Sequence, residues 1–306
     1  MASHVDPDGD AIGTQLAFAS YLRRLGKEVF LVRDDEVPAK YRFLPGADAI
    51  PHISSYGPNF SVPAALILEC PNIERIGQAS RFLAPQARIV NIDHHQDNEV
   101  FGEINWIDSH VSSVGEMAFE YFNWVGFEIS PQTAELLYAA ILTDTGRFRY
   151  TSTSPRTMAI AGHLIEAGAN PKKICDHVYY NLRPSSMRLI GKVLNGIEFY
   201  DAGSICLLTL TQQMLEECNA DFSESDGLVD FTLFTQGVVV GALLKETNSA
   251  HTKVSFRSRD SVDVAAIALR FGGGGHHNAS GCTLPFELSR AKKEVIKLLR
   301  EARDAQ

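Results

Sequence analysis

The chain has 306 residues, of which 45% are hydrophobic and 21% are charged, and its formal net charge is -9. This length exceeds a usual single core, so we expect two folded domains, and the composition excludes a disordered chain. The negative charge argues against a protein that coats long nucleic acid. A small anionic substrate stays compatible, because bound cations can invert the local field of an acidic pocket.

The longest apolar run, residues 238–244, falls short of the roughly 20 residues that a membrane span needs. The first residues lack the basic and apolar regions of a secretory signal, so we expect a cytoplasmic protein with no membrane partner. The five cysteines form no C-x-x-C motif, which favours reduced thiols over disulfides or a zinc site.

The first segment is a loop rich in potential metal ligands. His4, Asp8 and Asp10 are separated by a proline and a glycine, which break any regular element. In such a tight loop alternate side chains can converge, and carboxylates together with imidazole favour manganese or iron over magnesium. The alternative is an Asx-rich turn that caps the following helix, predicted over residues 11–25.

Apolar runs predict strands at residues 28–33, 64–68, 89–92 and 104–108. The second of these ends in Glu69, and the third ends in Asp93, His94 and His95. Open α/β sheets place their chemistry at the carboxyl ends of parallel strands, so we expect a metal or a hydrogen-bond network there. Solvated strand-end residues are the alternative.

Apolar spacing predicts helices at residues 114–125, 131–142, 155–167 and 171–179, and a connecting helix near 185–196. The second of these helices leads into Asp144, and a carboxylate at a helix C-terminus is disfavoured by the helix dipole. Asp144 therefore needs a compensating cation, unless it is only a turn residue. Strands at 205–210, 238–245 and 252–257 then indicate a different, mixed α/β unit. The predicted organisation is a domain at 1–183, a connecting helix at 184–196 and a second domain at 197–306.

Four glycines, residues 272–275, follow an apolar helix and precede His276. Without Cβ atoms, glycines let a ligand approach backbone N–H groups closely, so this segment is a candidate anion cradle. Its spacing matches neither a Walker A loop nor a dinucleotide fingerprint. A flexible hinge between a helix and a strand is the alternative.

Together these motifs resemble the DHH phosphoesterase superfamily, in the branch with a DHHA1 domain whose members act as nanoRNase and pAp phosphatase. The matching segments span nearly the whole chain: residues 4–10, Glu69, 93–95, 143–145 and 272–281. The resemblance implies an α/β fold with an N-terminal parallel-sheet DHH domain that has helices on both faces. It also implies a smaller C-terminal mixed α/β DHHA1 domain, with the active site in the cleft between the two.

The resemblance further implies two manganese ions per chain, with magnesium or cobalt as substitutes. The implied ligands are His4 and Asp8 for one ion, Asp10, His94 and Asp144 for the other, and Glu69 as the bridge. His95 is expected to contact the scissile phosphate, and Asp93 to orient the imidazoles. A water between two cations about 3.5–4 Å apart would be acidified for in-line attack on phosphorus. The implied phosphate-binding residues of the second domain are Arg257, Gly273, Gly274, Gly275 and His276.

Two features depart from the family pattern. Family members usually carry Asp where this chain has Glu69, and they have a full first strand before the His4 motif, which is either frayed or trimmed here. We expect a manganese-dependent phosphoesterase that converts short RNA or DNA oligonucleotides to mononucleotides and removes the 3′-phosphate of pAp. A cyclic dinucleotide phosphodiesterase, an inorganic pyrophosphatase and a catalytically weakened nucleotide-binding protein are the alternatives. A homodimer is left open.

Overall fold

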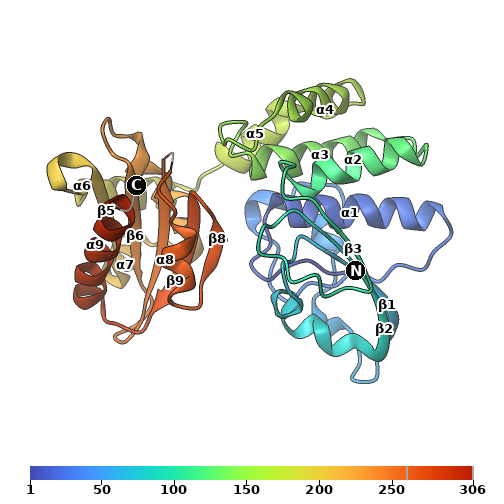
Figure 1. Cartoon of the computed structure of the whole chain (residues 1–306), viewed down its shortest axis with the longest axis horizontal. Coiled ribbons are helices and arrows are strands. Elements are labelled where there is room, and N and C mark those ends of the chain that lie inside the picture. Colours follow the sequence, from blue (N-terminus) through green and yellow to red (C-terminus); the bar gives the residue numbers. More distant parts are fainter. Residues whose placement is uncertain (260, 305–306) are drawn as a thin grey trace. The chain divides into compact units, whose positions relative to one another are not determined.

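The computed structural model describes residues 1–259 and 261–304. The chain forms two compact units, Met1–Asn181 and Leu182–Gln306, which run from blue to green and from yellow to red in Figure 1. The predicted connecting helix is α6 (Pro184–Asn195), and it packs against the second unit. In the part of the chain described, no helix combines the length and apolar character needed to cross a membrane.

The first unit is built on a parallel sheet with the strand order β1–β2–β3. The strands are β1 (Val62–Leu68), β2 (Leu83–Asp93) and β3 (Ile104–Ile107). Leu68 lies opposite Ile92, and Asp93 lies opposite Ile107, so the carboxyl ends of the strands share one edge. This register places the residues that follow β1 and β2 side by side.

Both faces of this sheet are covered, as the apolar strands predict. Helices α1 (Gly9–Arg24), α2 (Val114–Trp124) and α3 (Pro131–Asp144) pack together over the face that buries Leu68 and Ile92. The other face buries Ile67 against the 3-10 helix η4 (Ile73–Phe82). Helices α4 (Pro155–Glu166) and α5 (Pro171–Tyr179) complete the unit. Each of α3, α4 and α5 begins with a proline after a serine or asparagine N-cap, which explains why their starts were predictable.

The strand predicted at residues 28–33 is wrong. The segment makes only one isolated bridge, at Arg33. Its Val32 N–H donates to the Met1 carbonyl, but the Val32 carbonyl accepts a hydrogen bond from the side chain of Gln15. The Gln15 side chain therefore occupies the Val32 carbonyl oxygen, which a continuous strand would use to pair with its neighbour.

The second unit is a mixed sheet with the strand order β4–β5–β6–β7–β9–β8, in which only β5 and β6 are parallel. Its strands are β4 (Glu198–Tyr200), β5 (Ile205–Leu210), β6 (Val240–Glu246), β7 (Thr252–Ser258), β8 (Gly274–His276) and β9 (Ala279–Leu284). Helices α8 (Ala265–Leu269) and α9 (Leu288–Asp304) cover one face. Helices α6, α7 (Gln212–Cys218) and the 3-10 helix η7 (Leu228–Phe234) cover β5 and β6 on the other.

The glycine-rich segment forms one strand of a hairpin, so the hinge interpretation is wrong. β8 pairs antiparallel with β9, and a Cβ on Gly273 would lie 2.2 Å from the Gly281 carbonyl oxygen. Gly275 has a φ of +134°, and a Cβ there would lie 2.5 Å from the Ala279 carbonyl oxygen. These two glycines are required for close strand pairing. Their role as an anion cradle stays a prediction.

Candidate metal centre

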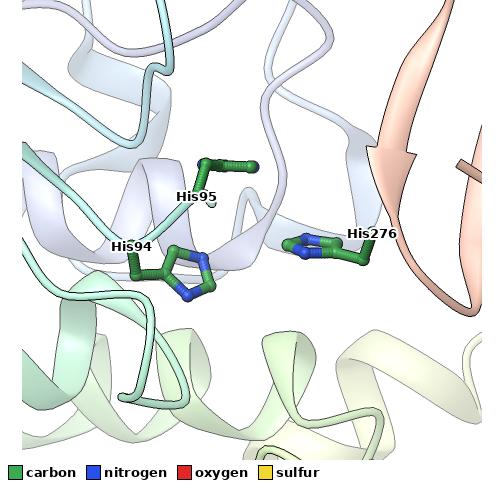
Figure 2. Close-up of side chains that lie close together, drawn as sticks. All are labelled: His94, His95 and His276. Atoms are coloured by element: carbon green, nitrogen blue, oxygen red, sulfur yellow. The ribbon is translucent and has the colours of Figure 1, made fainter. Parts of the chain in front are cut away.

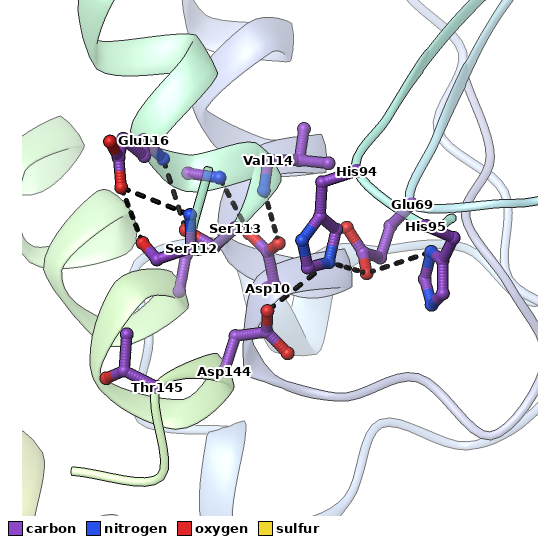
Figure 3. Close-up of polar contacts among 12 residues, drawn as sticks. Asp10, Glu69, His94, His95, Ser112, Ser113, Val114, Glu116, Asp144 and Thr145 are labelled. Carbon is purple, nitrogen blue, oxygen red and sulfur yellow. Dashed lines mark hydrogen bonds and ion pairs between the residues drawn. The ribbon is translucent and has the colours of Figure 1, made fainter. Parts of the chain in front are cut away.

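Three segments bring acidic side chains to the carboxyl edge of the first sheet (Figure 3). Asp10 lies in the first turn of α1, Glu69 follows β1 directly, and Asp144 is the last residue of α3. Gly9 makes this convergence possible, because a Cβ there would lie 2.4 Å from Thr143 Oγ1. A larger residue would separate α1 from α3 and move Asp10 away from Asp144.

Asp10 is fully buried and held by the N-terminus of α2. Its Oδ2 accepts from the Val114 N–H at 2.7 Å, and its Oδ1 accepts from the Gly115 N–H at 2.9 Å. These N–H groups favour a carboxylate. Burial, however, raises the pKa of Asp10 well above its ordinary value, and the neighbouring Glu69 and Asp144 carboxyls raise it further. A bound cation would favour the ionised form of Asp10, because its charge opposes both effects.

Glu69 is the most unusual residue of the cluster. It is 1% exposed, its φ is +59°, and the structure gives its Oε2 no hydrogen-bond partner among the described residues. Burial and nearby carboxyls raise the pKa of Glu69 well above its ordinary value. A left-handed backbone and an unsatisfied buried oxygen each cost on the order of 1–3 kcal/mol. A bound cation would offset part of this cost, because it supplies the partner that Oε2 lacks.

His94 lies between two of these carboxyls. Its Nε2 is 3.1 Å from Glu69 Oε1 and 3.3 Å from Asp144 Oδ2. Burial lowers the pKa of His94, but Asp144 and Asp10 outweigh it, so the pKa is raised. The pKa of Asp144 is also raised, to about 6, and there burial is the main cause. The raised pKa of His94 favours its protonated form, whose charge would offset part of the charge of the neighbouring carboxylates.

The structure thus brings ligand atoms of Asp10, Glu69 and His94 within 4.8 Å of one another, with Asp144 beside them. Carboxylate oxygens and an imidazole nitrogen are a donor set for manganese, iron or zinc. The orphan Oε2 of Glu69 and the raised carboxyl pKa values fit a divalent cation at this cluster.

His4 and Asp8, the other predicted ligands, form a pair of their own. Asp8 is the N-cap of α1 and accepts from the Ala11 N–H at 2.9 Å, so the helix-cap interpretation is confirmed. His4 Nε2 lies 3.8 Å from Asp8 Oδ1, and His4 Nδ1 lies 2.7 Å from the Val5 carbonyl oxygen. A cap uses only one carboxylate oxygen, so a ligand role for Asp8 stays a prediction.

Asp93 orients His95. The Asp93 Oδ1 lies 2.7 Å from His95 Nδ1 and accepts from the His94 N–H at 2.9 Å. Burial raises the pKa of Asp93, but the hydrogen bonds from His95 and Asn98 outweigh it and hold the pKa below its ordinary value. The His94 and His95 rings lie 5.1 Å apart and are inclined by 60° (Figure 2). Both rings approach Glu69 Oε1, His94 at 3.1 Å and His95 at 3.6 Å, but His94 also lies near Asp144 and His95 near Asp93.

Sequence reasoning missed two asparagines behind this motif. Asn98 Nδ2 donates to Asp93 Oδ2 at 2.6 Å, and it also lies 2.9 Å from Asn91 Oδ1 and 3.1 Å from the Cys70 carbonyl oxygen. Asn91 is fully buried within β2. Asn91 interrupts the apolar run at residues 89–92, and such a position could have indicated a buried hydrogen-bond network. Asn98 lies in a polar loop, where the sequence offers no such indication.

We expect Asn98→Ala to lower kcat about 10- to 100-fold, the usual effect of removing a group that orients the side chains of a metal site. The reason is that the buried Asp93 carboxylate loses a donor and holds His95 less firmly. Steady-state kinetics would show the loss in kcat rather than KM. Asn105→Ala is the matched control, because the side chain of Asn105 on β3 exchanges hydrogen bonds with the Gly102 backbone rather than with Asp93. An unchanged kcat together with a lower Tm would show that Asn98 serves stability alone.

In the second unit, two of the predicted phosphate-binding residues, Arg257 and His276, lie in one row of the sheet. Arg257 on β7 and His276 on β8 both pair with Ala279 on β9, so the small alanine side chain lies between them. Arg257 Nε donates to Asp230 Oδ1 at 2.8 Å, and Nη1 donates to the Phe256 carbonyl at 2.9 Å. These bonds fix the direction of the guanidinium. The residues of β7, β8 and β9 include no acid.

Comparisons with known proteins agree with this arrangement. Residues 1–141 match the model of the DHH family, N-terminal domain, and residues 207–302 match the DHHA1 domain. The bifunctional oligoribonuclease and PAP phosphatase NrnA of Thermus thermophilus is 33% identical, covering 98% of this chain and 89% of that protein. The protein of the same name from Bacillus subtilis is 29% identical, covering 92% of this chain and 87% of that protein.

Among solved structures, an exopolyphosphatase-related protein from Bacteroides fragilis superposes with a TM-score of 0.92 and 28% identity. The match covers 99% of this chain and 92% of that one. The family models, the near full-length identity and the shared fold confirm the resemblance found in the sequence. The chain is therefore a member of the DHH phosphoesterase family, in the branch that carries a DHHA1 domain.

Proposed function

We propose that this chain is a hydrolase that releases mononucleotides from short oligonucleotides and removes the 3′-phosphate of pAp. One observation carries the proposal: the buried cluster of Asp10, Glu69 and His94, in which Glu69 Oε2 has no partner in the described chain. Two relatives that align with more than nine-tenths of the chain are named for both activities. A cyclic dinucleotide phosphodiesterase and an inorganic pyrophosphatase are outcomes of the test below.

The metal we propose is manganese, with two ions per chain. Mixed carboxylate and imidazole ligands favour it over magnesium, which prefers oxygen donors and retains its waters. The proposed ligands are His4, Asp8, Asp10, Glu69, His94 and Asp144. Bound divalent cations supply an acidified water and stabilise negative charge on a phosphoryl group.

The protein's own groups then position the substrate. Asp93 accepts the Nδ1 proton of His95 at 2.7 Å, which fixes the imidazole ring so that it can contact the scissile phosphate. In the second unit we propose that Arg257, Gly273, Gly274, Gly275 and His276 bind the rest of the nucleotide. A guanidinium already anchored by Asp230 loses little freedom when it binds phosphate.

The homodimer and the cytoplasmic location stay predictions.

A substrate panel assayed with and without manganese tests this function. The panel contains pGpG, pAp, a cyclic dinucleotide and inorganic pyrophosphate, and chromatography identifies the products. We expect manganese-stimulated release of GMP from pGpG and of AMP from pAp. Turnover of pyrophosphate alone would identify a pyrophosphatase. Binding of pGpG without any turnover would identify a nucleotide sensor in which Glu69 has disabled catalysis.

A further inference from the structure

The loop that follows Asp144 has an unusual backbone. Gly146, Arg147 and Phe148 have φ values of +55°, +66° and +60°, so three consecutive residues are left-handed. For non-glycine residues this conformation costs roughly 1–2 kcal/mol each. Strained segments of this kind persist only where the surroundings impose them, and they cluster at functional sites.

Thr145 and an aromatic contact hold the strained loop in place. The buried Thr145 accepts hydrogen bonds at its carbonyl from the N–H groups of Arg149 and Tyr150, at 3.0 and 2.9 Å. Its Oγ1 accepts from the Phe148 N–H at 3.0 Å. The Phe148 ring packs edge-on against Tyr138 of α3, at 6.1 Å between centroids. The conformation is therefore built into the loop.

This loop carries two exposed arginines within five residues of Asp144. Arg147 Cζ lies 4.7 Å from the centre of the Tyr179 ring, and Arg149 Cζ lies 5.4 Å from that of Tyr150. Both arginines are exposed, and among the described residues the side-chain contacts given for them are with tyrosine rings rather than with acids. Three residues of chain span at most about 11 Å, which limits the distance from the Asp144 Cα to the Arg147 Cα.

We propose that Arg147 and Arg149 bind the substrate phosphate that is not cleaved. Arginine binds phosphate through two parallel N–H donors, and stacking on tyrosine restricts the guanidinium before the substrate arrives. The acidic cluster nearby repels anions, so cations beside it are needed to attract a second phosphate. This inference rests on the proposed function and adds a preference for substrates with a terminal phosphate.

The pair pGpG and GpG isolates this phosphate, because the two dinucleotides differ only in the 5′-phosphate. The variant is Arg147→Gln combined with Arg149→Gln. The control is Arg81→Gln, since Arg81 is also exposed and stacks on its neighbour Phe82 at 4.9 Å. We expect the ratio of kcat/KM for pGpG to that for GpG to fall at least tenfold in the double variant, mainly through KM. The control is expected to keep the wild-type ratio.

An unchanged ratio in the double variant, or an equal loss on both substrates, would overturn the inference.

A wild type that hydrolyses neither dinucleotide would instead contradict the proposed function. The inference would then be tested by measuring how tightly the nucleotides bind. In that case calorimetry compares pAp with 3′-AMP on the manganese-loaded protein. Loss of the preference for pAp in the double variant, with the preference kept in Arg81→Gln, supports the phosphate subsite. Equal preference in all three proteins refutes it.

Discussion

Replacing His94 or Asp144 with alanine is expected to lower phosphoesterase activity at least about 100-fold. This loss is larger than the one usually seen when a residue that hydrogen-bonds to a metal ligand is changed. His94 Nε2 lies within 3.3 Å of carboxylate oxygens from both Glu69 and Asp144. Either change therefore removes a donor from the same cluster. Purified variants should also contain less manganese than wild type, as measured by mass spectrometry of the metal.

His163→Ala is the control for this pair. His163 lies on α4 of the same unit, is exposed, and contacts Glu166 rather than the buried cluster. It should keep both activity and metal content. Asp144→Asn adds a test that preserves shape, because the amide keeps the volume but loses the charge. Full manganese content and normal turnover in His94→Ala would remove His94 from the ligand set.

The convergence of the buried cluster was predictable because its parts are local. A run of apolar residues marks each of β1 and β2, and the polar residues that follow must lie at the strand ends. Parallel strands then place Glu69 and His94 at one edge. Asp144 was located by the helical spacing that ends there. The resemblance to a known family supplied their expected role as ligands.

What could not be predicted depends on contacts between distant residues. Composition alone cannot show that Gly273 packs against the Gly281 carbonyl. The sequence therefore predicted no strand in the glycine-rich segment. The left-handed backbone of Glu69 and of residues 146–148 is likewise invisible in sequence. In the second case a hydrogen bond from the Phe148 N–H to Thr145 Oγ1 supports it. The segment at 28–33 has strand-like residues, but its backbone groups bond elsewhere.

Glu69 carries the second large expected effect, in which activity and stability change in opposite directions. Glu69→Gln should lose most activity, because a neutral amide cannot offset two divalent cations. Glu69→Asp should stay active with an altered metal preference, since a shorter carboxylate can still bridge if the ions shift. Near wild-type rates in Glu69→Ala would mean that Glu69 is only a strand-end acid. An inactive wild type rescued by Glu69→Asp would support the sensor.

The metal-free protein supplies a readout that does not depend on turnover. Asp144 has a pKa of about 6 in the folded protein against 3.8 for an ordinary aspartate. Asp10 and Glu69 are also shifted upward. A carboxyl group with a raised folded-state pKa binds its proton more tightly when folded, so the free energy of unfolding falls as pH rises through that window. Without metal, Asp144 should make the folded protein less stable as the pH rises from about 4 to about 6.

Glu69→Gln removes one of these buried carboxyl groups. Its Nε2 amide group takes the place of Oε2 and can donate a hydrogen bond to a neighbouring carboxylate. The metal-free variant should therefore be more stable than metal-free wild type at pH 7, by about 1–3 kcal/mol, the cost of an unsatisfied buried polar group. Urea unfolding in EDTA at pH 5 and 7 measures the difference, which should be smaller at the lower pH, because the raised pKa of Glu69 favours its protonated form as the pH falls. The exposed Glu74→Gln is the control and should show no such gain. Equal stability of Glu69→Gln and wild type at both pH values would mean that Glu69 is not strained by its neighbours, and the argument for a cation at Oε2 would lose its main support.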